Sequence, residues 1–410
     1  MTPNESPQPN FKMVAKTYSG LEEVLAEELN QLGGQEITIQ KRAVLFRGGQ
    51  ELLYRANLYL RTALRILKPI AEFSIENESD LYRKVREIDW SSYLDVDDTL
   101  AVNGVLKSNR IRHSKYLALK VKDAIADQFR AKFGHRPSVD VSDPTLRLNV
   151  YLFNDRCTVS LDSSGDSLHK RGYRLESNQA PLNEVLAAGM VLLSGWNRRS
   201  NFVDPMCGSG TIIIEAALWA LNLPPNGQRR TFGFTKWKDF NSKLYKKILE
   251  EVPKNRQAFD FEIVGADQSD HALRMAAANI KRAGLEKEIT CIKVPFEFFV
   301  PPQGGGTLIT NPPYGERMKK EGIGEFYERI GDHLKRFFSG YDAWILSANQ
   351  EAIKRIGLRA SRKHTLYNGG LLCKFQKYSM YEGSKKQRKR RTNEHELARK
   401  FNPDSESGLK

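Results

Sequence analysis

Cysteine is scarce in this sequence, and long apolar runs are missing from it. The four cysteines, Cys157, Cys207, Cys291 and Cys373, form no Cys-x-x-Cys pair. This spacing argues against a disulfide framework and a zinc site, so we expect no metal and expect each cysteine to be a small buried side chain. No run of about 18 apolar residues occurs, so a membrane-spanning helix is not supported. The first residues have neither a basic start nor an apolar stretch, so we expect no signal peptide and predict a cytoplasmic protein.

Positive charge is in excess, but it is unevenly distributed. The net charge is +15 and the pI is about 9.5, yet residues 1–177 hold about 26 basic and about 24 acidic side chains. The densest basic run is Lys385–Arg391, within a segment, 384–410, that we expect to be a disordered tail because closely spaced like charges repel. The excess indicates a polyanionic partner, most simply nucleic acid, and a disordered basic tail can itself bind phosphates.

Short strands alternate with helices in the first part of the chain, after a polar, proline-rich leader at residues 1–10 that we expect to be disordered. A chain of 410 residues is too long for one core, so two or three domains are expected. The alternation over residues 11–70 is typical of an α+β module. The expected strands cover residues 11–16, 36–39, 43–46 and 61–67, and the expected helices cover residues 20–29 and 51–60.

A second α+β module is predicted over residues 71–165. Two strand-like runs, 147–153 and 157–162, are joined by a short polar turn and indicate a β-hairpin, and residues 116–129 have the pattern of a long amphipathic helix. Basic side chains gather just before that helix, where they either contact RNA phosphates or form an ordinary charged surface. These residues are Lys107, Arg110, Arg112, His113 and Lys115.

Glycine, serine and basic residues replace these patterns at residues 162–174, where we place a domain boundary with a linker at 166–180. The sequence Ser-Gly-Asp-Ser-Leu-His-Lys-Arg-Gly-Tyr-Arg at 164–174 resembles the Ser-Gly-x-x-Leu-His-Lys-Arg-Gly-Tyr-Arg linker of the THUMP-domain RNA methyltransferases. The resemblance implies that residues 11–70 are a ferredoxin-like module and residues 71–165 a THUMP module. In that family these modules bind structured RNA.

The C-terminal half, residues 181–383, has the pattern of a Rossmann-like α/β domain. A helix at 181–193 is followed by a strand, a turn containing Gly208 and Gly210, and a second helix. The next strand ends at Asp267, an acid that can accept hydrogen bonds from both hydroxyls of a ribose. This order indicates a parallel sheet that binds its ligand at the carboxyl ends of the strands. An NAD site fits poorly, because the triple-glycine fingerprint is incomplete.

A further strand runs into Asn311-Pro312-Pro313-Tyr314, where two prolines fix φ and remove two backbone donors, which makes a rigid corner. The side-chain oxygen of Asn311 and the Asn-Pro carbonyl can both accept hydrogen bonds from one NH2 group, and the ring of Tyr314 offers a face on which a base can stack. These residue types suit chemistry on an amine attached to a flat ring. Taken alone, they are equally consistent with a plain strand-ending turn.

The order of these motifs resembles that of class I S-adenosylmethionine methyltransferases acting on exocyclic amines, most closely the bacterial 23S ribosomal RNA guanine-N2 methyltransferases. The resemblance implies that Asn311, Pro312 and Tyr314 are catalytic and that S-adenosyl-L-methionine is the cofactor. This sequence departs from the family pattern near Pro295, because family members usually carry an acid at that place, beside the adenine of the cofactor. There Glu297 substitutes for the acid, or Phe296 packs against the adenine. The implied cofactor-binding residues are Asp204, Pro205, Cys207, Gly208, Gly210, Thr211, Asp267, Gln268, Phe296 and Asn311.

The resulting hypothesis is direct methyl transfer from S-adenosyl-L-methionine to the N2 amine of a guanosine in 23S ribosomal RNA. It needs no covalent cysteine, so Cys207 has no catalytic role in it. Other acceptors remain open, namely adenine N6, guanine N2 in transfer RNA, or a glutamine amide in a protein. A non-catalytic RNA-binding or ribosome assembly protein is a further alternative. The basic excess and the N-terminal modules favour RNA as the partner, and no membrane partner is expected.

Overall fold

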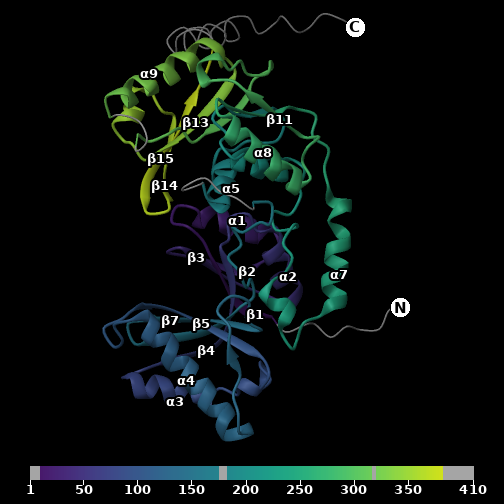
Figure 1. The fold of residues 1–410 in the computed structure, drawn as a ribbon, viewed down its shortest axis with the longest axis vertical. Coiled ribbons are helices and arrows are strands. Elements are labelled where there is room, and N and C mark those ends of the chain that lie inside the picture. Colours follow the sequence, from purple (N-terminus) through teal and green to yellow (C-terminus); the bar gives the residue numbers. More distant parts are fainter. Residues whose placement is uncertain (1–9, 175–181, 316–319, 382–410) are drawn as a thin grey trace, which may run out of the picture.

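Three regions follow one another along the long axis of the molecule in a computed structural model, which describes residues 10–174, 182–315 and 320–381. The second N-terminal module lies at one end, the first module lies in the middle, and the C-terminal domain lies at the other end (Figure 1). The expected disordered leader, apart from residue 10, and the expected basic tail lie outside the described residues. No helix within the described part of the chain is long and apolar enough to span a membrane.

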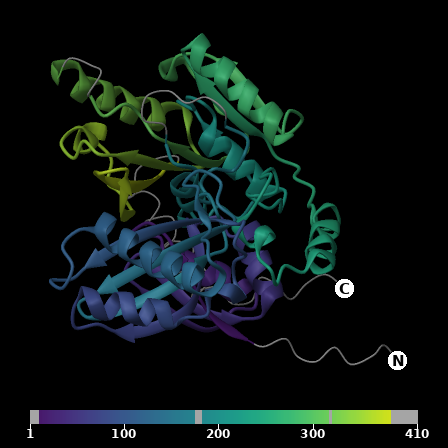
Figure 2. The same ribbon diagram turned by 60° about the horizontal axis from the view of Figure 1, so that its bottom comes forward.

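One eight-stranded sheet, in the order β2-β3-β1-β4-β8-β7-β5-β6, runs through both N-terminal modules. Strand β4 links them, because it pairs with β1 of the first module and with β8 of the second. Figure 2 shows the two helices of the second module, α3 and α4, lying side by side across one face of its strands. The strands are β1 (Phe11–Lys16), β2 (Gln35–Gln40), β3 (Ala43–Gly48), β4 (Arg65–Ser74), β5 (Thr99–Lys107), β6 (Ser138–Val139), β7 (Leu146–Phe153) and β8 (Arg156–Asp162), and the helices are α1 (Glu22–Gln31), α2 (Gln50–Tyr59), α3 (Glu78–Glu87) and α4 (Ser114–Phe133).

The α+β character of both modules is confirmed, with one expected strand placed wrongly. Residues 61–64 lie in the turn after α2, and β4 begins only at Arg65. The turn is held by Glu28 of α1, whose carboxylate accepts hydrogen bonds from the backbone amides of Arg61 and Thr62, at 2.7 and 3.0 Å. Those amides are therefore taken by a side chain and cannot join a strand ladder. The hairpin between β7 and β8 forms as predicted.

A seven-stranded sheet, in the order β11-β10-β9-β12-β13-β15-β14, forms the C-terminal domain. The first five strands in this order, from β11 through β9 to β13, are parallel, and β15 pairs antiparallel with β13. The chain moves from β9 outward to β10 and β11, then returns to β12 on the other side of β9, so the strand order reverses at β9. The strands are β9 (Asn201–Asp204), β10 (Ile263–Asp267), β11 (Ile289–Lys293), β12 (Gly306–Thr310), β13 (Tyr341–Ser347), β14 (Arg362–Asn368) and β15 (Leu371–Ser379), and the helices are α5 (Glu184–Leu193), α6 (Thr211–Ala220), α8 (Asp270–Ala283) and α9 (Lys320–Phe337).

The chain between α6 and β10 departs from the domain, and the sequence analysis predicts no element there. A helix, α7 (Ser242–Glu251), forms in this stretch and stands beside the first module, away from the C-terminal sheet (Figure 1). Aromatic side chains that precede α7 enter the N-terminal core, where Phe234 stacks on Tyr54 of α2 with ring centroids 4.4 Å apart. The stretch thus fastens the C-terminal domain to the first module.

Candidate active site

Three ends of parallel strands bring the predicted site residues to one edge of the C-terminal sheet. Asp204 ends β9, Asp267 ends β10, and Asn311 follows the last residue of β12. Strands β10 and β12 are the two neighbours of β9, so the three residues surround the point where the strand order reverses. This is the place where open α/β sheets bind their ligands.

Asp204 is directly linked to the corner that follows β12. Its side chain is only 1% exposed, and its Oδ1 accepts hydrogen bonds from the hydroxyl of Thr310, at 2.7 Å, and from the amide of Met206, at 3.2 Å. Burial raises the pKa of the Asp204 carboxyl to about 7, and the nearby charge of Asp267 contributes. The sequence analysis missed Thr310, whose signal is a polar residue at the end of an apolar strand, directly before Asn311.

The glycine turn after β9 faces open space. Gly208 has φ +54°, and a β-carbon built on it would meet no atom within 4 Å. Its amide donates to Oδ2 of Asp267 at 3.0 Å, while Oδ1 of Asp267 accepts from the amide of Ser269 at 2.9 Å. Gly210, at φ +82°, precedes the first turn of α6, whose amides can receive an anion. The turn therefore fits a ligand that carries a carboxylate and a ribose.

Other predicted cofactor residues are distributed around this turn. Pro205 is buried, and Gln268 is exposed directly after Asp267. The sulfur of Cys207 lies 3.1 Å from a β-carbon built on Gly265, so it points into the sheet. The neighbouring Cys291 thiol and burial raise the pKa of Cys207, which keeps its thiol protonated at neutral pH. The cysteine is thus a buried packing residue, as expected.

The hydroxyl of Thr211, the first residue of α6, binds the linker. It accepts a hydrogen bond from the guanidinium of Arg174, which also pairs with Glu184 of α5 at 3.1 Å and donates to the carbonyl of Leu182 at 3.1 Å. The Thr211 side chain is therefore engaged by protein and is not free to bind a cofactor through this lone pair. Arg174 was not predicted as a site residue, although it ends the motif on which the family resemblance rests.

Asn311 and Tyr314 contact each other across the proline corner. The Tyr314 hydroxyl donates a hydrogen bond to Oδ1 of Asn311 at 2.5 Å, and its oxygen lies 3.8 Å from the sulfur of Cys373 in β15. Burial raises the pKa of Tyr314 far above its ordinary value, so the hydroxyl stays a donor. A carbonyl oxygen has two lone pairs, so Asn311 can still accept a second hydrogen bond.

The region after β11 gives its two candidate residues different surroundings. Phe296 is buried and meets the ring of His333 in α9 edge to face, with centroids 5.0 Å apart. Glu297 forms an ion pair with Arg329 of α9 at 3.2 Å. Glu297 is therefore already paired with a side chain of the protein, whereas the ring of Phe296 is buried in the domain. A contact between Phe296 and an adenine stays a prediction.

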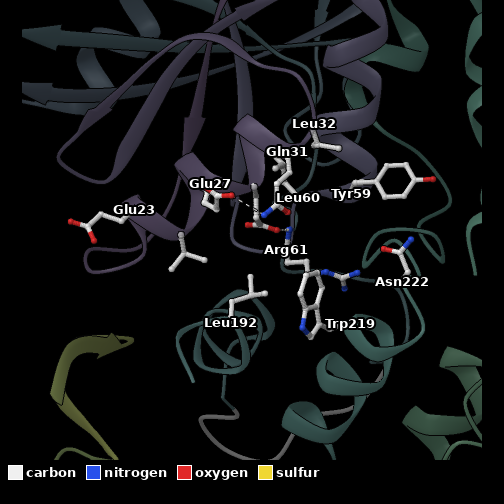
Figure 3. A pocket seen from close by; sticks show the side chains of 12 residues that line it. Glu23, Glu27, Gln31, Leu32, Tyr59, Leu60, Arg61, Leu192, Trp219 and Asn222 are labelled. Atoms are coloured by element: carbon white, nitrogen blue, oxygen red, sulfur yellow. Dashed lines mark hydrogen bonds between the residues drawn. The ribbon is translucent and has the colours of Figure 1, made fainter. Parts of the chain in front are cut away.

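A cavity of about 460 Å³ lies elsewhere, where the first module meets α5 and α6. Figure 3 shows Gln31 and Glu27 of α1 on one side of it, with Leu192 of α5 and Trp219 of α6 on the other. The guanidinium of Arg61 lies 5.2 Å from the ring of Trp219. No predicted site residue lines this cavity, so its size does not make it the active site.

Models of three protein families match consecutive parts of the chain. The RlmL ferredoxin-like domain matches residues 12–67, the THUMP domain matches residues 76–162, and the RMKL-like methyltransferase domain matches residues 171–377, which is half of the chain. The chain belongs to the RMKL-like methyltransferase family. The resemblance found in the linker and the strand-end motifs is thereby confirmed.

Two curated relatives cover most of the chain. The protein named "Putative RNA methyltransferase slr0064" of Synechocystis is 39% identical over 376 residues, which are 91% of this chain and 97% of that protein. The ribosomal RNA large subunit methyltransferase K/L of Syntrophotalea carbinolica is 40% identical over 384 residues, which are 91% of this chain and 54% of that protein. The chain thus spans about half the length of the K/L relative.

Solved structures share the fold. The crystal structure of SMU.472 complexed with SAH is 29% identical, has a TM-score of 0.83, and covers 92% of this chain and all of that one. A Listeria monocytogenes protein named as a "predicted N6-adenine-specific DNA methylase" is 29% identical, with a TM-score of 0.81 and coverage of 91% and 97%. These neighbours confirm the class I methyltransferase fold, and the bound SAH is the product left when S-adenosylmethionine donates its methyl group.

Proposed function

We propose that the chain is an S-adenosylmethionine-dependent RNA methyltransferase that methylates the N2 amine of a guanosine in 23S ribosomal RNA. One observation carries the proposal. The hydrogen bond from Thr310 to Asp204, at 2.7 Å, joins the strand that presents Asn311 to the strand that ends in the glycine turn. An amine-binding corner and a turn that fits a cofactor are therefore held next to each other. The proposed substrate assigns the reaction to the cytoplasm.

The cofactor would be held by groups of different chemistry on β9, β10 and α6. The first amides of α6 would bind its carboxylate, the Asp267 carboxylate would bind its ribose hydroxyls, and Gly208 would leave room for its chain. The Asp204 carboxylate, when ionised, favours a cationic group in the same turn. When bound, S-adenosylmethionine supplies a methyl group on a positively charged sulfur.

Asn311 and Tyr314 would orient the amine. Oδ1 of Asn311 already accepts from the Tyr314 hydroxyl at 2.5 Å, and this bond restrains rotation of the side-chain amide. The second lone pair of that oxygen and the Asn311 carbonyl would accept the two hydrogens of an NH2 group. The nitrogen lone pair then points along one direction, and orientation of this kind accounts for much of the acceleration of a transfer step. A paired base must leave its stack to reach this position.

The second N-terminal module offers a surface suited to RNA. Tyr151 and Phe153 on β7 are 37% and 42% exposed and stack on each other, with ring centroids 6.3 Å apart. The ammonium of Lys107 lies 5.8 Å from the Phe153 ring centroid, Arg110 is exposed between β5 and α4, and Lys115 is exposed in the first turn of α4. Exposed aromatic rings beside basic side chains bind unpaired nucleotides well. These exposed rings support RNA contact as the proposed role of the basic cluster.

One other acceptor has some support. The Listeria neighbour's printed name favours adenine N6, which presents the same planar NH2 group to the corner. The K/L relative's printed name favours large-subunit ribosomal RNA. The decisive experiment incubates the full chain and S-adenosylmethionine with ribosomal RNA from cells that lack this gene, then identifies the methylated nucleosides by mass spectrometry. N2-methylguanosine from 23S RNA supports the proposal, N6-methyladenosine redirects it, and no methylation refutes it.

The Asn311→Ala variant tests the assigned chemistry. It removes the side-chain oxygen that accepts from the amine but leaves the glycine turn intact, so turnover should fall about 1,000-fold or more while the Kd for the cofactor changes less than about threefold. Asn197→Ala, at an exposed turn away from the site, is the matched control and should keep both values. If Asn311→Ala loses turnover and cofactor affinity equally, Asn311 does not have the proposed role.

A further inference from the structure

The proline corner cannot hold itself in place. Pro312 and Pro313 have no N–H groups, so the corner offers backbone acceptors but few donors. Two consecutive carbonyls accept hydrogen bonds from side chains outside the corner. The Tyr327 hydroxyl donates to the carbonyl of Pro313 at 3.4 Å, and the Asn349 side-chain amide donates to the carbonyl of Tyr314 at 3.0 Å.

These two donors belong to one connected network. The backbone amide of Asn349 donates to the hydroxyl of Ser347 at 3.1 Å, and that hydroxyl lies 2.8 Å from the hydroxyl of Tyr327. Tyr327 and Ser347 are fully buried, and Ser347 ends β13, the strand next to the one that leads into the corner. Burial raises the pKa of Tyr327 to about 12, so its hydroxyl remains protonated and can donate at neutral pH.

Asn349 is itself fixed by the residues that follow it. Its side-chain oxygen accepts a hydrogen bond from the amide of Ala352 at 2.9 Å, which leaves the side-chain nitrogen as the group that faces Tyr314. This arrangement assigns the orientation of the amide, because the opposite orientation would place two donors against each other. The donor toward the corner is therefore specified by the fold around residue 352.

We propose that Asn349, together with Ser347 and Tyr327, is a positioning group that holds Asn311 and Tyr314 for methyl transfer. The inference rests on the function proposed above and adds three residues outside the amine-binding motif. None of them touches the reacting atoms. They act by fixing the two carbonyls of a corner that lacks donors of its own, because a shift of about 1 Å at the reacting centre can cost about 100-fold in rate.

Asn349→Asp is the sharpest variant, because it changes one group and keeps the shape. The aspartate can still accept from Ala352 through one oxygen, but its other oxygen now faces the Tyr314 carbonyl as a second acceptor and repels it. We expect kcat to fall about 10- to 100-fold, with KM and Kd for S-adenosylmethionine within about twofold of the wild-type values.

A pair of tyrosine variants provides the control for general destabilisation. Tyr327→Phe and Tyr341→Phe each remove one buried hydroxyl that donates to a proline carbonyl, of Pro313 in one case and of Pro302, at 2.7 Å, in the other. Both variants lose a buried hydrogen bond of the same kind, so their midpoints of denaturant unfolding should shift by similar amounts. Only Tyr327→Phe acts on the corner, so we expect its kcat to fall about 3- to 10-fold and the kcat of Tyr341→Phe to stay within about twofold.

The measurements use the full chain, methyl-labelled S-adenosylmethionine and 23S ribosomal RNA from cells lacking this gene. A wild-type protein that transfers no methyl group overturns the proposed function itself. A wild-type protein that is active, with Asn349→Asp equally active, overturns only the positioning role. If Asn349→Asp does not fold, the tyrosine pair decides, and equal kcat values for its two members contradict the inference.

Discussion

The proline corner after β12 and the junction between the ferredoxin-like module and the methyltransferase domain are built in opposite ways. The corner spans four consecutive residues and is held by neutral hydrogen bonds, such as those to Asn311 and Tyr314. The junction collects charged side chains from distant segments, including Arg61, Arg171 and Glu215, and buries them. The two regions therefore differ in the kind of contact that holds them: neutral hydrogen bonds hold the corner, whereas buried charges attach the domain.

Arg171 of the linker is the centre of the junction. Its guanidinium forms an ion pair with Glu215 of α6 at 3.3 Å and donates to the carbonyls of Leu168, at 2.9 Å, and Arg61. It also donates to the side chain of Asn226 at 3.2 Å. These contacts join the linker, the turn after α2, helix α6 and the segment that leads toward α7. Because both ionic partners are fully buried, each depends on the other for compensation of its charge.

The largest effect is expected from Arg171→Ala, which breaks the junction. It leaves Glu215 buried without its charge partner and several acceptors without a donor, so unfolding free energy should fall by about 3–5 kcal/mol. Lys170→Ala is the matched control, since its surface ion pair with Asp166 contributes about 0–1 kcal/mol. Denaturant unfolding measures both variants. Equal losses would mean that the buried charge does not hold the junction.

The sequence predicts more of the site at the strand ends than of the junction, because the junction is assembled from distant segments. Asn311, Tyr314, Asp204 and Asp267 lie at strand ends that apolar runs reveal, so the strand ends could be predicted and the structure brings them to one edge. The role of Thr310 could not be predicted, because it depends on which strands are neighbours in the sheet. The junction could be predicted even less. Its contacts link residues that are often more than 100 positions apart, and sequence periodicity carries no information on such pairs.

Helix α7 was missed for a related reason. Its segment is highly charged, and Ile248 is its only fully buried apolar residue. The helix is stabilised by packing on α2 of another module, which local pattern does not reveal. The contacts of the corner were also not predicted, because Asn349 and Tyr327, which donate to it, lie outside the Asn-Pro-Pro-Tyr motif.

Asp204 is a buried carboxyl that accepts a hydrogen bond from Thr310, the residue directly before the corner. Its folded-state pKa is about 7, above its unfolded value of about 3.9. The protonated form is therefore favoured on folding, and cofactor-free stability should decline as pH rises from about 4 to about 7. A cationic group in the glycine turn favours the ionised form, so affinity for S-adenosylmethionine should rise about tenfold per unit of pH below 7 and level off above it.

Asp204→Asn should remove both pH dependences. Calorimetric titration of wild type and variant with S-adenosylmethionine between pH 5.5 and about 8, combined with denaturant unfolding at the same values, measures them. The variant should bind more weakly than wild type at pH 8, with an affinity that no longer changes with pH. An unchanged slope in Asp204→Asn would assign the titration to another group and remove Asp204 from the proposed cofactor site.

The smallest effect is expected at the outer edge of the junction, where Tyr54 of α2 meets the start of α7. The amide of Asn241 donates to the Tyr54 hydroxyl at 2.9 Å, and the Asn241 side chain in turn accepts from the amide of Leu244 in the first turn of α7. Tyr54→Phe keeps the stack on Phe234 and removes only this hydroxyl, so the loss should be about 1 kcal/mol.

That loss should be local, because Tyr54 holds α7 and touches no site residue. Hydrogen exchange of the α7 amides should become about fivefold faster in Tyr54→Phe, while exchange in β9 and β12 and the kcat for methyl transfer stay at wild-type values. Tyr82→Phe, which removes a hydroxyl that donates to Asp127 in the THUMP domain, should leave α7 unchanged. If Tyr54→Phe instead slows methyl transfer, the junction and the corner are coupled, and the separation between attachment and positioning does not hold.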